Sequence, residues 1–134
     1  MAISFAGKTA IVTGAGGGLG RAHALDLAAR GANVVVNDLG GSRDGTGASD
    51  AALQVVEEIK AAGGSAIANG GSVTDFAAMQ AMVEEAKSAF GGVHILINNA
   101  GILRDKRFAK MDMVDFQTVI GVHLIGTANC TKAV

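Results

Sequence analysis

Two patterns of apolar residues alternate along the chain. Short, nearly continuous apolar runs rich in β-branched residues are typical of strands covered on both faces of a parallel sheet. These runs fall at 9–13, 33–37, 65–69 and 93–98. Between them, apolar residues recur every three or four positions, which predicts helices over 18–30, 50–62 and 75–90. This alternation predicts an α/β fold with a doubly wound parallel sheet, in which right-handed crossovers give the strand order 3-2-1-4.

The predicted helices differ in how much of their surface is apolar. The second and third each carry one apolar stripe, as expected for helices that lie on a sheet. The stripes are Ala52, Val55, Val56 and Ile59, and Phe76, Met79, Val83, Ala86 and Phe90. Glycines at 31, 63 and 91 lie where left-handed C-terminal caps would end the first three helices. A fourth helix begins near Asp112, and its apolar residues surround much of its circumference, so it needs cover on several sides. They are Phe116, Val119, Ile120, Val122, Leu124, Ile125 and Ala128.

Composition excludes several classes of partner. The 134 residues can bury one core, as a single domain or part of one. A formal net charge of −1 offers no broad attraction for nucleic acid or an anionic membrane, and no apolar run approaches the roughly 18 residues of a membrane span. We therefore expect no nucleic-acid partner, no membrane partner and a cytoplasmic location. Cys130 cannot form an internal disulfide and fits a small buried apolar residue, and no Cys/His spacing indicates a metal site.

The most specific local feature is the glycine-dense turn after the first apolar run, within KTAIVTGAGGGLG at 8–20. A strand that leads through such a turn into a helix presents unpaired backbone N–H groups to a pyrophosphate. The glycines follow the pattern T-G-x-x-x-G-x-G, and no register supplies the common G-x-G-x-x-G. Candidate cofactor-binding residues here are Gly14, Gly16, Gly17, Gly18, Leu19 and Gly20. The turn predicts dinucleotide binding, with an ordinary α/β loop as the alternative.

Asp38 ends the second apolar run, where an acidic side chain accepts hydrogen bonds from the adenosine ribose of NAD. Its charge disfavours the 2′-phosphate of NADP, since two like charges about 4 Å apart repel by on the order of 4 kcal/mol at an effective dielectric of 20. Arg43 is the nearby cation that argues against this preference, and we expect it to be solvated. The alternative is that Asp38 only opens a turn. We expect NAD as the cofactor.

A second motif, Asn98-Asn99-Ala100-Gly101, follows the fourth apolar run. With the T-G-x-x-x-G-x-G turn before it, the chain resembles the short-chain dehydrogenase/reductase family from Lys8 to Val134. Within that family, VVVNDLGG at 34–41, NNAGILRD at 98–105 and VHLIGT at 122–127 are most similar to the hydroxyacyl-CoA dehydrogenase domains of peroxisomal multifunctional enzymes and bacterial relatives.

The resemblance implies roles for further residues. Asn98, Ala100 and Gly101 would line the adenosine ribose. Gly71, Ser72 and Val73 replace a family Asp-x-Val or Asp-Ser-Val, so the acid for the adenine amino group is missing and Ser72 or the backbone is left for that contact. His123 lies where the family usually has an asparagine of the proton relay, and is our catalytic candidate; a satisfied core histidine is the alternative. His23 and His94 are expected to be structural. Arg104 and Asp105 either border the substrate mouth or form a solvated pair.

The family's catalytic tyrosine has no counterpart here, because the sequence contains no tyrosine. The resemblance implies a Tyr-x-x-x-Lys pair with an upstream serine. We therefore expect residues 1–134 to be the dinucleotide-binding part of a single dehydrogenase domain whose C-terminal portion is absent, without dehydrogenase activity of its own. In the complete enzyme the last helix would pack against another subunit, as a homo-oligomer.

Three functions are compatible with the sequence. The first is an NAD-dependent oxidoreductase acting on a secondary alcohol or ketone, such as a 3-hydroxyacyl-CoA or a steroid, with the peroxisome as an alternative location. The second is a non-catalytic module that binds NAD or a partner. The third is an α/β methyltransferase, which predicts a glycine loop and an acid after the second strand but not the NNAG motif.

Overall fold

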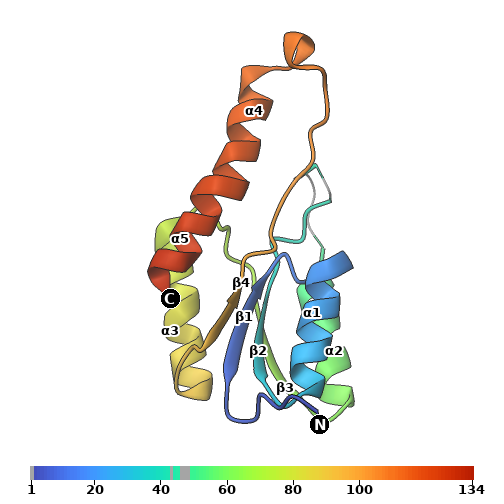
Figure 1. Cartoon of the computed structure of the whole chain (residues 1–134), viewed down its shortest axis with the longest axis vertical. Coiled ribbons are helices and arrows are strands. Elements are labelled where there is room, and N and C mark those ends of the chain that lie inside the picture. Colours follow the sequence, from blue (N-terminus) through green and yellow to red (C-terminus); the bar gives the residue numbers. More distant parts are fainter. Residues whose placement is uncertain (1, 43, 46–48) are drawn as a thin grey trace.

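The computed structural model describes residues 2–42, 44–45 and 49–134, so Arg43 lies outside the described residues. Four parallel strands, β1 (Thr9–Thr13), β2 (Asn33–Asn37), β3 (Ser65–Asn69) and β4 (Ile95–Ile97), form one sheet. The strand order β3-β2-β1-β4 confirms the predicted topology. The carboxyl ends of the strands all lie at the upper edge of the sheet in Figure 1.

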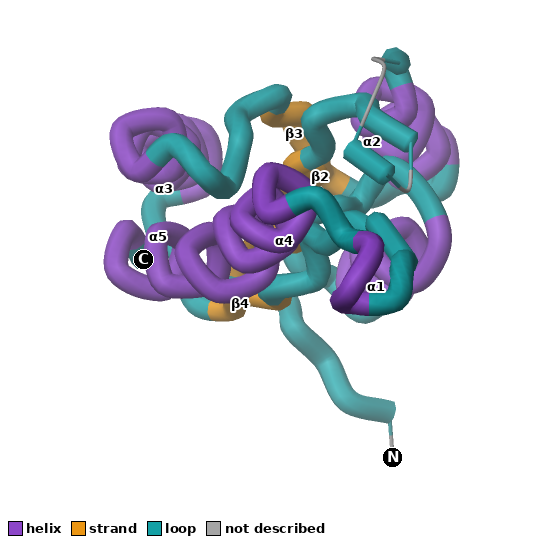
Figure 2. Tube along the Cα trace, turned by 90° about the horizontal axis from the view of Figure 1, so that it is seen from above, coloured by secondary structure: helices purple, strands orange, loops and turns teal. Residues whose placement is uncertain are grey.

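Helices cover both faces of this sheet. The helices α1 (Gly18–Ala29) and α2 (Ala51–Ala61) lie on one face, and α3 (Phe76–Phe90) and α5 (Gly126–Ala133) lie on the other (Figure 2). Alternate strand residues supply the two cores: Val12, Val34 and Val36 pack toward α1 and α2, while Ile11 and Val35 pack toward α3 and Cys130. Both faces of each central strand are thus apolar, which explains their continuous hydrophobic runs.

The helix stripes and ends follow the predicted pattern. Ala52, Val55, Val56 and Ile59 of α2 are buried, as expected. In α3, Met79, Val83 and Ala86 are buried together with Met82, whereas Phe76 and Phe90 are only partly buried. The three predicted capping glycines have left-handed backbones, with φ of 96° at Gly31 and 88° at Gly63 and Gly91. Glycine ends these helices because an L side chain is strained at positive φ.

The fourth strand is shorter than the predicted 93–98. At its start, the His94 side chain takes the place of a backbone acceptor: Thr9 N–H donates to Nδ1 of His94 over 2.9 Å. His94 N–H in turn donates to the Thr9 carbonyl. At its end, Asn99 N–H donates to the Ile97 carbonyl over 3.0 Å and turns the chain out of the sheet. His94 is structural, as expected, and His23 is exposed on α1.

The predicted last helix contains a π turn. It comprises α4 (Met113–Ile120), the π turn η2 (Gly121–Ile125) and α5, and Figure 1 shows one continuous rod whose α4 end projects beyond the sheet. Asp112 caps its start by accepting from Val114 N–H over 2.9 Å. A 3₁₀ turn, η1 (Phe108–Lys110), packs on α4 through the rings of Phe108 and Phe116, 6.1 Å apart. Much of the apolar surface of α4 and η2 stays exposed.

Candidate dinucleotide-binding site

The glycine turn between β1 and α1 requires glycine for two different physical reasons. Gly14 and Gly18 have φ of 62° and 53°, in the left-handed region. Gly20 is needed for space, since a Cβ there would lie 2.2 Å from the Gly14 carbonyl oxygen. The first turn of α1 can therefore lie directly against the loop that precedes it.

The ligand-facing part of the turn is open. Gly17 is the N-cap of α1 with an extended backbone, and a Cβ there would meet nothing within 4 Å. No side chain of the described residues caps this helix, so N–H groups of its first turn remain available. Gly17, Gly18 and Leu19 are exposed, Leu19 by 73% of its surface. An uncapped helix start reached by a glycine turn fits a phosphate group.

Thr13 and Asn99 hold the end of β4 against this turn. The Thr13 hydroxyl accepts from the backbone N–H groups of Asn99 and Ala100, over 3.1 and 2.9 Å. The Asn99 amide donates to the carbonyls of Thr13 and Gly14, both over 3.1 Å. Asn99 was missed as a site residue in favour of Asn98, although both residues stand at the carboxyl end of a strand beside β1. The amide of Asn98 instead donates to the Thr131 hydroxyl of α5 over 3.2 Å.

Asp38 fixes the other side of the turn. Its Oδ2 accepts from Gly16 N–H over 2.8 Å, and its Oδ1 accepts from Gly40 N–H over 2.7 Å. A Cβ at Gly16 would lie 2.8 Å from the Asp38 carboxyl carbon, so this contact also requires glycine. Because each carboxylate oxygen can accept more than one hydrogen bond, both retain acceptor capacity for a ligand hydroxyl.

The segment after β3 carries the three residues expected near adenine. Gly71 is held by two asparagines: its carbonyl accepts from the Asn37 amide and its N–H donates to Asn69 Oδ1, both over 2.9 Å. The Ser72 hydroxyl lies 2.7 Å from that of Thr74. Val73 is buried, and its carbonyl accepts from an amide of α5. Ser72 thus serves a local turn in this structure, and Val73 serves packing.

His123 lies in the π turn and contacts the segment after the NNAG motif. Its Nε2 is 3.1 Å from Ile102 N and 3.0 Å from the Ile102 oxygen, so it accepts from one or donates to the other according to its tautomer. A Cβ at Gly101 would lie 2.6 Å from the ring. The side chain of His123 is exposed in the described part of the chain.

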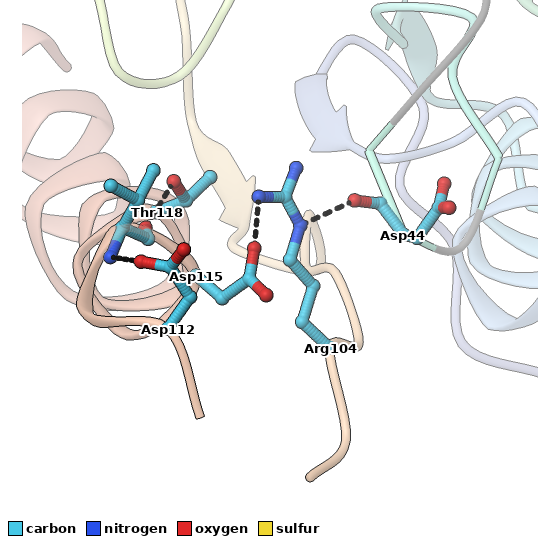
Figure 3. A network of polar contacts seen from close by, with 6 residues as sticks. Asp44, Arg104, Asp112, Asp115 and Thr118 are labelled. Atoms are coloured by element: carbon cyan, nitrogen blue, oxygen red, sulfur yellow. Dashed lines mark hydrogen bonds and ion pairs between the residues drawn. The ribbon is translucent and has the colours of Figure 1, made fainter. Parts of the chain in front are cut away.

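Arg104 does not pair with Asp105. Its Nη1 lies 2.9 Å from Oδ1 of Asp115 in α4, and its Nε donates to the Asp44 carbonyl over 3.0 Å (Figure 3). Arg104 and Asp115 expose only 23% and 27% of their side chains. The alternative of a solvated Arg104–Asp105 pair is therefore wrong for Arg104, whereas Asp105 is exposed. The guanidinium joins α4 to the connection that follows β2.

Other chemistry-bearing groups lie away from the turn. Cys130 is buried in the core between α3 and α5, and burial raises the pKa of its thiol. Among the described residues, no group of three or more potential ligands is placed to hold a metal ion. Every helix described is too short or too polar to cross a membrane.

Comparison with known proteins gives this geometry a class. A family model described as short chain dehydrogenase matches residues 8–134, and the chain therefore belongs to the short-chain dehydrogenase family. Family membership sets aside the methyltransferase alternative. The observed strand order agrees with the dehydrogenase family.

Individual relatives cover nearly the whole chain. Peroxisomal multifunctional enzyme A of Dictyostelium discoideum is 56% identical over 99% of this chain, which spans 30% of that protein. A putative short-chain type dehydrogenase/reductase of Mycobacterium tuberculosis is 50% identical over 94% of this chain, which spans 44% of it. A solved short chain dehydrogenase from Mycobacterium avium superposes with a TM-score of 0.87 at 48% identity, covering 96% of this chain and 44% of that one. The chain thus spans less than half the length of each of these relatives.

Proposed function

We propose that this chain forms the cofactor-binding part of an NAD-dependent oxidoreductase that interconverts a secondary alcohol and a ketone. The observation that carries the proposal is the meeting of three segments at the carboxyl edge of the sheet: the open glycine turn after β1, Asp38 after β2 and the NNAG motif after β4. In a doubly wound sheet, that edge is where dinucleotides bind.

Each segment would meet a different part of the cofactor. Backbone N–H groups from Gly14 to Gly20 would hold the pyrophosphate, and the carboxylate of Asp38 would accept from the adenosine ribose. Asn98, Ala100 and Gly101 would line that ribose, with residues 71–73 beside the adenine. When bound, the nicotinamide supplies the hydride chemistry. The protein contributes orientation, and His123 would help to hold a water on the proton path beside Gly101.

The alcohol or ketone substrate class is supported by what the relatives are called. One relative is a 3-oxoacyl-[acyl-carrier-protein] reductase of Staphylococcus aureus, 42% identical over 93% of this chain, which spans 48% of it. A solved relative is a hydroxysteroid dehydrogenase from Escherichia coli, 37% identical with a TM-score of 0.86 over 98% of this chain and 52% of that one. Both names describe an oxo or hydroxy carbon, which favours a 3-hydroxyacyl thioester or a steroid. The name of the Dictyostelium relative favours a peroxisomal over a cytoplasmic location.

Calorimetric titration of the purified protein with NAD and with NADP tests the cofactor. We expect tighter binding of NAD, because the Asp38 carboxylate repels a 2′-phosphate by up to about 4 kcal/mol at 4 Å and an effective dielectric of 20. Asp38→Asn removes the charge but keeps one oxygen acceptor. The ratio of NAD affinity to NADP affinity should therefore decrease, and the affinity for NAD should also fall.

The matched control is Asp50→Asn, which removes an exposed acid at the start of α2. This variant should keep the wild-type ratio of NAD to NADP affinity. Tighter binding of NADP by the wild type would reverse the cofactor assignment, and absence of binding by both would refute the proposed function.

The exposed face of the last helix favours a second function, the binding of a partner. This function would either accompany catalysis or be the function of a non-catalytic module. A second copy of the same chain is the partner that we propose, and its test is given in the Discussion.

A further inference from the structure

Arg104 joins two segments that border the proposed cofactor site. It belongs to the connection between β4 and α4, directly after the NNAG motif. Nε donates to the main-chain carbonyl of Asp44 over 3.0 Å, in the connection that begins at Asp38. Nη1 donates to Asp115 Oδ1 over 2.9 Å, in the first turn of α4. Figure 3 shows the guanidinium between these two partners.

Backbone packing reinforces the contact on the Asp44 side. Gly45 has φ of 86°, and a Cβ there would lie 3.2 Å from Cγ2 of Ile102 and 3.8 Å from Nη2 of Arg104. The backbone at Gly45 therefore lies directly against the segment that carries Arg104. At the base of the β2–α2 connection, Gly40 N–H donates to Asp38 Oδ1, while Oδ2 of the same carboxylate accepts from Gly16 N–H in the glycine turn.

On the α4 side, the partner of Arg104 is Asp115, which lies in a capped helix turn. Asp112 accepts from Val114 N–H over 2.9 Å and so defines the first turn of α4, which presents Asp115. Two acidic side chains in this turn also complement the positive end of the helix dipole. Because Arg104 and Asp115 are both about three-quarters buried, water and salt screen the pair less than a surface ion pair.

We propose that Arg104 is a positioning residue that holds Asp44 and Gly45, a few residues beyond Asp38, beside the adenosine ribose and thereby sets the lifetime of bound NAD. The inference rests on the proposed function. Two residues that are already held in place lose less entropy when the dinucleotide binds. Release of the adenosine end then requires Asp44 and Gly45 to move, which the two divergent hydrogen bonds of the Arg104 guanidinium oppose. Changes at such a contact act mainly on the dissociation rate.

Stopped-flow measurement of NADH binding to the purified protein tests this role. Arg104→Ala should raise the dissociation rate about tenfold, as expected for loss of charge-assisted hydrogen bonds, and should change the association rate by less than about twofold. Arg104→Lys should restore part of the loss, because it keeps a charge for Asp115 but lacks the second, divergent donor. Asp115→Asn should raise the dissociation rate by a smaller factor.

Two further variants separate the positioning role of Arg104 from the effect of removing any positive charge from this connection. Arg107→Ala removes an exposed arginine from the same connection, so its dissociation rate should stay within about twofold of wild type. Gly45→Ala leaves Arg104 and α4 intact but strains the Asp44 side, and it should also speed dissociation. Thermal unfolding of every variant reports the structural contribution separately.

The possible outcomes distinguish the two proposals. If the wild type binds no NADH, the proposed function fails. If it binds NADH and Arg104→Ala lowers the thermal midpoint without changing the dissociation rate, or if Arg107→Ala has an equal effect on that rate, the role of Arg104 is refuted alone. Should Arg104→Ala not fold, unchanged dissociation rates in Arg104→Lys and Asp115→Asn would refute it equally.

Discussion

At the residue scale, the approach of Gly20 to Gly14 decides whether the glycine turn can form. A Cβ at Gly20 would lie 2.2 Å from a backbone oxygen and 2.5 Å from the Asn99 amide nitrogen, so relief requires the backbone to move. We expect Gly20→Ala to destabilise the protein by about 1–3 kcal/mol, as overpacking does, and to abolish NAD binding. Urea denaturation and an NAD titration measure the two effects.

Gly17→Ala is the matched control for this prediction. Gly17 is extended, with φ of −167° and open space around its Cβ direction. Stability should therefore change by less than about 1 kcal/mol, the scale of an N-cap substitution. NAD affinity should still fall, because the new methyl group would stand where the diphosphate approaches the helix. Equal losses of stability in the two variants would contradict the steric account.

Single residues also show where sequence patterns end. The glycines of the turn could be predicted because spacing alone identifies a strand, a turn and a helix start. Asn99 could not, since its amide binds main-chain oxygens of Thr13 and Gly14, which are 86 and 85 positions away. A bond to backbone leaves no complementary side chain in the sequence, whereas Asn98 was proposed from the family resemblance.

At the scale of elements, helix ends were predictable because one residue with a distinctive backbone determines them. Gly63 follows α2 with φ of 88°, and nothing lies within 4 Å of its Cβ direction. Gly63→Ala should therefore destabilise the protein through backbone strain alone, by about 1–2 kcal/mol. Urea denaturation with unchanged m-value would measure this loss.

Gly70→Ala provides the comparison at the end of β3. This glycine also has open space around it, but its φ is not in the left-handed region. The substitution should be neutral or stabilise by up to about 1 kcal/mol, because alanine restricts the unfolded chain. A loss at Gly70 as large as that at Gly63 would show that φ is not the cause.

Strand and helix interiors were less predictable wherever a distant contact intervened. The expected strand 93–98 shortens to Ile95–Ile97 because the imidazole of His94 takes the place of a backbone acceptor for Thr9. The π turn Gly121–Ile125 interrupts a helix that periodicity describes as regular. There His123 reaches the backbone of Ile102, a contact that depends on how α4 is placed relative to β4.

At the scale of the whole molecule, the strand order and the two cores follow from local sequence patterns and the right-handedness of the crossovers. The side-chain contacts between connections do not. Arg104 and Asp115 are 11 positions apart, and no periodicity relates them to each other or to Asp44. Their contact exists because the connections that follow β2 and β4 both begin at the same edge of the sheet, and the second leads into α4 (Figure 1).

The apolar face of the last helix carries the final prediction. Leu124 is 61% exposed, and Met113, Val114 and Ile125 are about half exposed or more. The α4 end of the helix projects beyond the sheet (Figure 1), and large apolar side chains there stay exposed among the described residues. Burying such a surface against a second copy would remove apolar area from water. We therefore expect self-association, which sedimentation velocity at increasing protein concentration measures.

Leu124→Glu should shift the distribution toward monomer, because association would bury an unpaired carboxylate. Leu53→Glu is the control, since Leu53 is 54% exposed on α2, on the opposite face of the sheet, and should leave association unchanged. Dissociation caused equally by both substitutions would indicate a general effect of charge. A wild-type protein that stays monomeric at every concentration would refute self-association, and the exposed face of α4 would then be available to a different partner.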